Sequence, residues 1–171
     1  CLSGAGTRIF AGAYDLGIMR SNNHGASWKI LDTAQYTSGG SQANAGWPDF
    51  SGGFCMTVLC DPVNPDKVWA GLAPDPGQAA DNGHLLRSAD GGNSWTVLGI
   101  PDGLPPGHIM GLSLDPTTPV GTRTLYVTTG SGTSAGGLVY RSLNDGVTWT
   151  RFPPSSTLTG MRFTAAYGGV V

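Results

Sequence analysis

Residues 20–28 read RSNNHGASW, residues 87–95 read RSADGGNSW and residues 141–149 read RSLNDGVTW. The three segments share the pattern Arg-Ser-x-Asn/Asp-x-Gly-x-Ser/Thr-Trp. In a chain of 171 residues, copies that recur at intervals beyond ~40 residues are typical of one small sheet per repeat, arranged around an axis. The sequence therefore predicts an all-β fold built from β-propeller blades.

Each residue type in the shared pattern suits a turn between two antiparallel strands. Glycine permits a positive φ in the turn. The serine and the Asn or Asp can hydrogen-bond the amides of the turn itself, and the tryptophan can bury a large area between neighbouring sheets. We therefore predict structural roles for Ser21, Asn23, Gly25, Trp28, Ser88, Asp90, Gly92, Trp95, Ser142, Asn144, Gly146 and Trp149.

We call the three segments 20–28, 87–95 and 141–149 boxes, and the sequence around them repeats as well. An aromatic or β-branched strand precedes each box, at 8–12, 67–71 and 124–128, and a strand that starts with glycine enters it, at 17–20, 83–87 and 137–141. Two repeats also carry an earlier inner strand, at 56–60 and 109–114, and each of these ends in Asp-Pro. Proline stops a strand and sets a turn. We therefore predict blades that are four-stranded antiparallel sheets.

Counted in strands, residues 1–171 form a single propeller segment of about three blades. We place blade 1 at about 7–33, blade 2 at about 53–99 and blade 3 at about 107–153, with the inner strand of a next blade at about 160–168. The chain is then expected to open at a second strand, residues 7–13. Closed propellers have four to eight blades, and an open arc exposes apolar faces and strand edges. We expect the remainder of the propeller to come from the same polypeptide or from self-association.

The composition of the chain excludes some classes of binding partner. The formal net charge is −2, and only 12% of the residues are charged, so there is no basic field to hold a nucleic acid or an anionic membrane. No apolar run approaches the ~18 residues needed to span a bilayer. Neither His84 nor His108 has a partner at metal-ligand spacing. We predict no metal and no cofactor.

Three cysteines, Cys1, Cys55 and Cys60, match neither a zinc site nor a dense disulfide framework. Cys55 and Cys60 lie in one strand-like run, and an odd separation puts them on opposite faces of a regular strand, where they cannot bridge. Buried free thiols are the favoured interpretation. A bond from Cys1 to one of the other two, or a lipid-modified Cys1, remain alternatives.

The repeated pattern resembles the Asp-box, or bacterial neuraminidase repeat, over nearly the whole chain. Within that group the sequence is most similar to the family 74 xyloglucanases. The similarity rests on Asp-Pro-x-x-Pro turns at 61–65 and 115–119, on the segment 11–20 that precedes the first box, and on a long segment followed by a Cys-bearing inner strand. The resemblance implies that Asp15 is a catalytic acid or base. A structural aspartate that caps a turn is the alternative.

Two further segments contain candidate ligand-binding residues. Residues 34–54 are longer than an ordinary connection, and such segments are often functional. Tyr36, Trp47 and Phe50 in it offer flat rings suited to sugar faces, although they could instead pack onto the propeller. Asp75, in the polar segment 73–82, could line the same face, although a solvated acid is the default.

These observations favour a secreted, extracellular, carbohydrate-active propeller that resembles β-glucan or xyloglucan hydrolases. Acid–base hydrolysis of a glycosidic bond needs two carboxylates, and the second would lie outside this chain. The alternative is a non-catalytic extracellular module, either a glycan-binding protein or a scaffold built from Asp-box blades.

Overall fold

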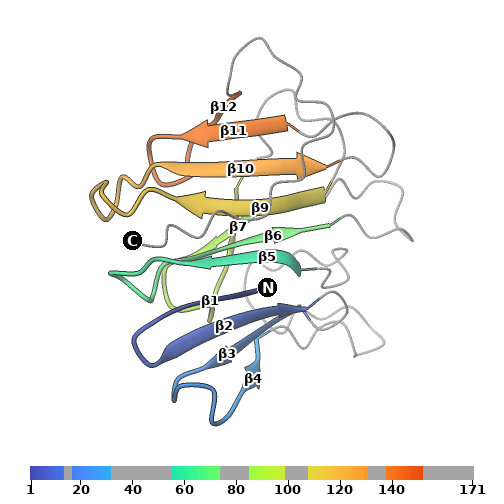
Figure 1. The fold of residues 1–171 in the computed structure, drawn as a ribbon, viewed down its shortest axis with the longest axis vertical. Helices are drawn as coiled ribbons and strands as arrows, with labels where there is room; N and C mark the ends of the chain where they lie inside the picture. Colours follow the sequence, from blue (N-terminus) through green and yellow to red (C-terminus); the bar gives the residue numbers. More distant parts are fainter. Residues whose placement is uncertain (14–16, 32–54, 74–84, 99–107, 131–137, 152–171) are drawn as a thin grey trace, which may run out of the picture.

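The computed structural model describes residues 1–13, 17–31, 55–73, 85–98, 108–130 and 138–151. Their strands form three four-stranded antiparallel sheets, each in simple sequential order (Figure 1). The first sheet contains β1 (Leu2–Ala5), β2 (Arg8–Ala13), β3 (Gly17–Ser21) and β4 (Lys29–Ile30). The second contains β5 (Cys55–Cys60), β6 (Val68–Leu72), β7 (Leu85–Ser88) and β8 (Thr96–Leu98). The third contains β9 (His108–Leu114), β10 (Leu125–Gly130), β11 (Leu138–Ser142) and β12 (Thr150–Arg151).

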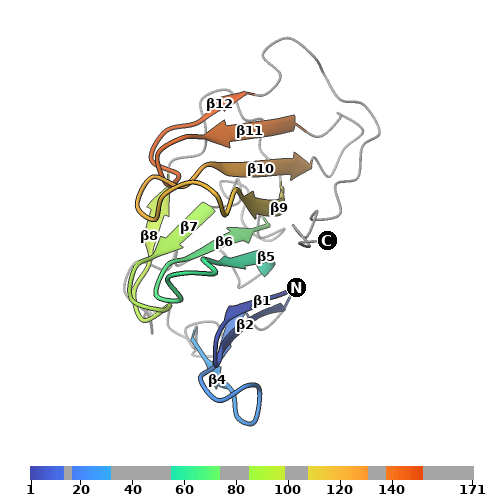
Figure 2. The ribbon, with the colours of Figure 1, turned by 60° about the vertical axis from the view of Figure 1, so that its left-hand side comes forward.

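This arrangement confirms the predicted all-β fold of propeller blades, and we call the three sheets blade 1, blade 2 and blade 3 in chain order. Figure 2 shows them following one another along the molecule. Among the described residues, no helix has the length and hydropathy to cross a bilayer. The inner strand expected at about 160–168 lies outside the described residues.

The prediction that the chain opens at a second strand was wrong. β1 (Leu2–Ala5) pairs with β2 in the register Leu2 to Ala11 through Ala5 to Arg8, so blade 1 has its own inner strand. The segment was missed because its residues, LSGA, lack the apolar run of the other inner strands. Position 4 has no room for a side chain, because a Cβ on Gly4 would lie 2.5 Å from the carbonyl oxygen of Arg8.

Two apolar layers hold the blades together, and blade 2 contributes to both. The layer between blades 1 and 2 includes Phe10, Ile18, Val68 and Trp95, and the layer between blades 2 and 3 includes Trp69, Ile109, Leu112 and Leu125. Because neighbouring side chains of a strand point to opposite faces, β6 supplies Val68 to one layer and Trp69 to the other. All five residues of β6 are buried.

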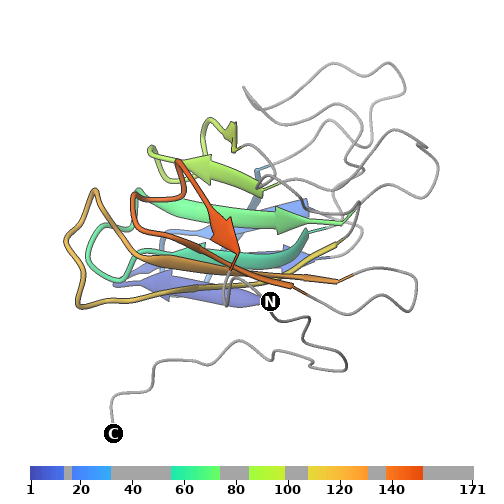
Figure 3. The same cartoon turned by 90° about the horizontal axis from the view of Figure 1, so that it is seen from above.

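The connections divide between the two ends of the blades. The turns from β1 to β2, from β5 to β6 and from β9 to β10 lie at the same end as the three box turns, on the left in Figure 1. Antiparallel pairing places the remaining strand ends at the opposite end of each sheet, as the view from above in Figure 3 also shows. The described residues include all the turns at the box end, and at the opposite end they stop at or near the strand ends.

The cysteine geometry differs from the prediction. The pairing of β5 with β6 shifts between Cys55 and Thr57, which is the signature of a β-bulge. Because the bulge inserts one extra residue, Cys55 and Cys60 point to the same face and both join the layer against blade 1. They remain free and buried thiols, as expected, and Cys1 is free and exposed.

Candidate functional site

The three box turns share one hydrogen-bond pattern. The serine hydroxyl oxygen accepts the amide of the box glycine at 2.8 Å in Ser21–Gly25 and Ser88–Gly92 and at 2.9 Å in Ser142–Gly146. The box glycines have φ values of +88°, +86° and +85°, which L side chains rarely adopt. The predicted serines and glycines therefore form the turn in all three blades.

The Asn or Asp of each box closes the same turn from the other side. Its Oδ1 atom accepts the amide four residues on, at 2.9 Å in Asn23–Ser27, Asp90–Ser94 and Asn144–Thr148. In the asparagine boxes the side-chain amide donates to the following hydroxyl. In the aspartate box the direction reverses, and the Ser94 hydroxyl donates to Asp90 at 2.6 Å.

The carboxylate of Asp90 is held in its ionised form. Burial raises its pKa, but the hydrogen bonds from the Ser94 hydroxyl and amide, the Ser88 hydroxyl and the Asn93 amide together lower the pKa below the ordinary aspartate value. Asp90 is therefore an ionised carboxylate at neutral pH, and it accepts the hydrogen bonds that form the turn. It is not poised to donate a proton in that range.

The arginines at the start of the first two boxes link neighbouring blades. Arg20 donates to the carbonyl oxygen of Gly91 in the next box, and Arg87 donates to the carbonyl oxygen of Asp145 in the box after that, at 3.3 Å. Gly91 and Asp145 both have positive φ values, +70° and +65°. Arg20 and Arg87 thus each donate a hydrogen bond to a backbone carbonyl of the following box turn, a role that the sequence analysis did not assign.

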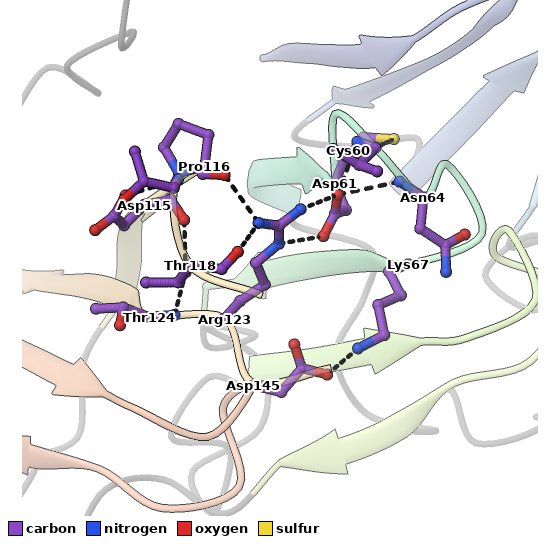
Figure 4. Close-up of polar contacts among 12 residues, drawn as sticks. Cys60, Asp61, Asn64, Lys67, Asp115, Pro116, Thr118, Arg123, Thr124 and Asp145 are labelled. Atoms are coloured by element: carbon purple, nitrogen blue, oxygen red, sulfur yellow. Dashed lines mark hydrogen bonds and ion pairs between the residues drawn. The ribbon is translucent and has the colours of Figure 1, made fainter. Parts of the chain in front are cut away.

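A second link between blades 2 and 3 is buried. Arg123 Nε and Nη2 donate to the two carboxylate oxygens of Asp61, at 2.7 and 2.9 Å (Figure 4). Asp61 Oδ1 also accepts the amides of Val63 and Asn64. Burial raises the pKa of Asp61, but the Arg123 hydrogen bond and these amides lower it below its ordinary value. The Asp-Pro turn of β5 therefore serves as a socket for an arginine of blade 3.

Two further ion pairs join the blades at the same end. Lys67 pairs with Asp145, which has a largely buried side chain (Figure 4). Arg8 pairs with Asp66 and also donates to the carbonyl oxygen of Pro65 at 3.0 Å. Both pairs connect one blade to the next, so charge-assisted contacts join all three blades at the box end.

The aspartates that the structure describes all have structural partners. Asp61, Asp66 and Asp145 pair with cations, whereas Asp90 and Asp115 accept hydrogen bonds within their own turns. Each of these five carboxylates is therefore bound by a cation or by groups of its own turn. Within the described ranges, no three His, Cys or Asp side chains gather as a metal site.

The predicted catalytic and ligand-binding residues lie outside the described residues. They are Asp15, Tyr36, Trp47, Phe50 and Asp75. The strand ends that flank them can be located. Asp15 falls between β2 and β3, Asp75 falls between β6 and β7, and the segment with the three aromatic residues falls between β4 and β5. All of these strand ends lie at the end of the blades opposite the box turns.

Some contacts could not be found from the repeat alone. The pairs Arg123–Asp61, Lys67–Asp145 and Arg8–Asp66 join residues 58 or more positions apart. The conserved position of the box arginine in all three copies was the available signal, and it indicated a shared task. The identity of the partner depends on how the blades stack.

The fold defines the class of protein: this is an all-β chain of propeller blades. No family model matches the chain. Among solved structures, the chain superposes on an ancestral GH74 enzyme with a TM-score of 0.59 at 19% identity, covering 91% of this chain and 18% of that one. It superposes on YCF48 bound to D1 peptide with a TM-score of 0.55 at 16% identity, covering 88% of this chain and 39% of that one. At these identities the likeness establishes the fold alone.

Sequence relatives point to a narrower group. The chain is 33% identical over 121 residues to a xyloglucanase from Paenibacillus sp, which covers 66% of this chain and 11% of that protein. It is 34% identical over 110 residues to Xyloglucanase Xgh74A from Acetivibrio thermocellus, which covers 59% of this chain and 12% of that protein. The chain is thus a propeller segment related to glycoside hydrolases, and it spans about a tenth of the length of these relatives.

Proposed function

We propose that this chain supplies three blades to a secreted, carbohydrate-active propeller that hydrolyses xyloglucan or a related β-glucan. Asp15 serves as one of the two carboxylates, and the second carboxylate lies outside this chain. The observation that carries the proposal is the identity of 33% over 121 residues with a protein named xyloglucanase.

The topology of the blades supports the position of the active face. The strands that flank Asp15, Asp75 and the aromatic segment 34–54 end at one edge of the sheets. The opposite edge is filled by box turns and ion pairs, and its aspartates are committed to structural partners. We therefore assign polysaccharide binding to the edge at which the strands that flank the candidate residues end.

The chemistry assigned to Asp15 is proton transfer. In glycoside hydrolysis, a carboxylic acid donates its proton to the leaving oxygen while the bond from that oxygen to the anomeric carbon breaks. A water oxygen joins the anomeric carbon, and a carboxylate takes up the proton of that water, either in the same step or after a covalent intermediate. Asp15 supplies one of these two carboxyl groups, and the net reaction consumes one water.

The test uses the full polypeptide that contains this chain, with xyloglucan as substrate. We expect Asp15→Asn to lower kcat by about 10²–10⁴-fold, because the amide can neither donate nor accept the proton. Asp115→Asn is the matched control, since it makes the same chemical change at the box end, where an amide oxygen can still accept the Thr117 amide. Hydrolysis by Asp15→Asn at the rate of the control would overturn the proposal.

The aromatic residues are assigned to substrate binding. We propose that Tyr36, Trp47 and Phe50 stack on sugar rings, with Asp75 bonding to hydroxyls on the same face. Trp47→Ala is then expected to raise KM for xyloglucan more than it lowers kcat, because stacking contributes to binding in the ground state and the transition state alike. A change confined to thermal stability would instead assign these rings to packing.

The exposed face of blade 1 supports the proposed remainder of the propeller. Trp28 is 43% exposed, whereas its counterpart in blade 2, Trp95, is 4% exposed and packs against blade 1. A further blade, from the same polypeptide or from a second copy, would cover Trp28 in the same way.

A non-catalytic glycan-binding or scaffold module is the second candidate. The structural use of every described aspartate favours it, because those carboxylates are bound by cations or by groups of their own turns. Retained binding of xyloglucan with no hydrolysis by the full wild-type polypeptide would support this candidate against the first.

A further inference from the structure

Cys1 lies directly opposite a glycine of the neighbouring strand. The Cys1 nitrogen donates to the carbonyl oxygen of Gly12 at 3.0 Å, and the Gly12 amide donates back to the carbonyl oxygen of Cys1 at 3.0 Å. Residues that exchange both hydrogen bonds in an antiparallel pair project their side chains to the same face. The Cys1 side chain therefore lies over a position that has no side chain of its own.

The thiol of Cys55, from the next blade, reaches the same position. A Cβ atom placed on Gly12 would lie 2.4 Å from Cys1 Sγ and 2.7 Å from Cys55 Sγ. The space that Gly12 leaves open is thus occupied from two sides by sulfur. The two sulfur atoms can be no further apart than the sum of those two distances. No other pair of thiols in the described residues is brought together in this way.

The bulge in β5 is what aims Cys55 at this space. In a regular strand, alternation counted back from Cys60 would turn Cys55 toward blade 3, whereas the bulge at Met56 turns it toward blade 1. Cys60, on the same face, sits further along the strand, where its amide donates to Ser3 Oγ at 2.8 Å. The two inner strands are therefore aligned with Cys60 beside Ser3 and Cys55 beside Cys1.

We propose that Cys1 and Cys55 form a disulfide bond that ties the inner strand of blade 1 to the inner strand of blade 2. This inference rests on the cysteine geometry and does not depend on the proposed enzymatic activity. The sulfur atoms must approach to about 2.05 Å, and the missing side chain of Gly12 leaves the space for that movement. The bond holds β1, a four-residue strand, against the propeller.

The reaction is a thiol–disulfide exchange with a small disulfide such as oxidised glutathione. The exposed Cys1 thiolate attacks one glutathione sulfur, which forms a mixed disulfide and releases one glutathione thiolate. The Cys55 thiolate then attacks Cys1 Sγ and releases the second glutathione. The two protein thiols are oxidised, the small disulfide is reduced to two thiols, and two protons are transferred to solvent or to the departing thiolates.

The two cysteines have different parts in this exchange. Cys1 is exposed and can meet the reagent. Cys55 is buried, and burial raises the pKa of its thiol to about 12. The second step is therefore slow at neutral pH and accelerates as pH rises, because the thiolate is the attacking species.

The test treats the full polypeptide that contains this chain with oxidised glutathione, then maps disulfides by non-reducing peptide mass spectrometry. We expect a peptide pair that joins Cys1 to Cys55, lighter than the two reduced peptides by the mass of two hydrogen atoms, with Cys60 still free. Cys1→Ser and Cys55→Ser should both abolish the pair, and the matched control Cys60→Ser should leave it in place.

Gly12→Ala tests the geometry without removing a thiol. Its added methyl group would occupy the space between the sulfur atoms, so we expect bridging to slow by at least tenfold at equal thiol content. A Cys1–Cys60 bond, a bond from Cys1 to a cysteine outside this chain, or three free thiols in the folded wild type after treatment would each overturn the proposal.

Discussion

Blades 1 and 2 contain nearly the same turn in different surroundings. Ser21 and Ser88 bond their glycines at the same distance, 2.8 Å, yet Trp28 is 43% exposed and Trp95 only 4%. Trp95 and Trp149 pack toward the blade before their own, and blade 1 has no such neighbour among the described residues. The turn forms in the same way in both blades, so its geometry is determined by the local sequence. The burial of its tryptophan, and the stability that this burial contributes, depend on the adjacent blade.

The same contrast holds for the charged links. Arg123–Asp61 joins blades 2 and 3 with side chains that are 2% and 0% exposed, and Arg8–Asp66 joins blades 1 and 2 with side chains that are 26% and 55% exposed. Water solvates the second pair and not the first. The two pairs therefore offer the sharpest way to compare a buried and an open inter-blade contact.

The largest effect is expected when the buried pair is broken. Asp61→Ala leaves the Arg123 guanidinium buried without its carboxylate, which costs about 3–5 kcal/mol in the free energy of unfolding. Asp66→Ala, the matched change in the exposed pair, is expected to cost about 0–1 kcal/mol. Urea denaturation followed by tryptophan fluorescence measures both. Equal losses would contradict the assignment of different burial to the two pairs.

The tryptophans provide the next largest contrast. We expect Trp95→Ala to destabilise the chain by about 3–5 kcal/mol, because it opens a cavity in the layer between blades 1 and 2. Trp28→Ala should cost about 1–2 kcal/mol, since much of its ring is already in water. The comparison becomes sharper in the full polypeptide, where a Trp28→Ala loss as large as that of Trp95→Ala would show that another blade covers Trp28.

The box glycines test the same point with a smaller change. Gly25 and Gly92 have nearly the same φ, +88° and +86°, so an alanine at either position carries about 1–2 kcal/mol of left-handed strain. At Gly92 the added Cβ would also lie 2.6 Å from Leu31 Cδ1, whereas at Gly25 the nearest atom is 3.7 Å away. We therefore expect Gly92→Ala to cost about 2–4 kcal/mol in thermal or urea unfolding. Equal costs at the two glycines would remove packing from the explanation.

Much of the strand framework could be predicted because its signals are local. The box pattern, the glycine that starts β3, and the Asp-Pro that ends β5 and β9 each act within a few residues. β1 was missed because its small residues gave no apolar signal, and the bulge at Met56 was missed because it depends on pairing with β6.

The candidate site could be predicted only from its sequence context. Asp15 and Trp47 were chosen for their place in the repeat and for resemblance, and they remain predictions because they lie outside the described residues. The inter-blade contacts of Arg123 and of the box arginines involve partners far apart in sequence. The stacking of blades determines those pairs, and a repeat pattern carries no record of it.

The smallest expected effect compares an aspartate box with the asparagine boxes. The pKa of Asp90 lies below its ordinary value in the folded chain, despite the burial that opposes this, because hydrogen bonds from Ser94, Ser88 and Asn93 favour the carboxylate. The unfolded value is about 3.9. The stability that Asp90 contributes is therefore fully present above that pH and is lost as pH falls through the folded pKa.

Reciprocal substitutions isolate this titration. Asp90→Asn should leave stability at pH 7 within about 0.5 kcal/mol, since Asn23 and Asn144 form the same turn, and it should make the acid side of the stability curve shallower. Asn144→Asp should make that side steeper, because the Thr148 hydroxyl can donate to a new carboxylate as Ser94 does to Asp90. Urea midpoints measured from pH 7 to pH 3 give both slopes. If neither variant changes its slope, the box carboxylate does not set the acid stability of blade 2, and the buried Asp61, whose pKa is also lowered, becomes the group to test.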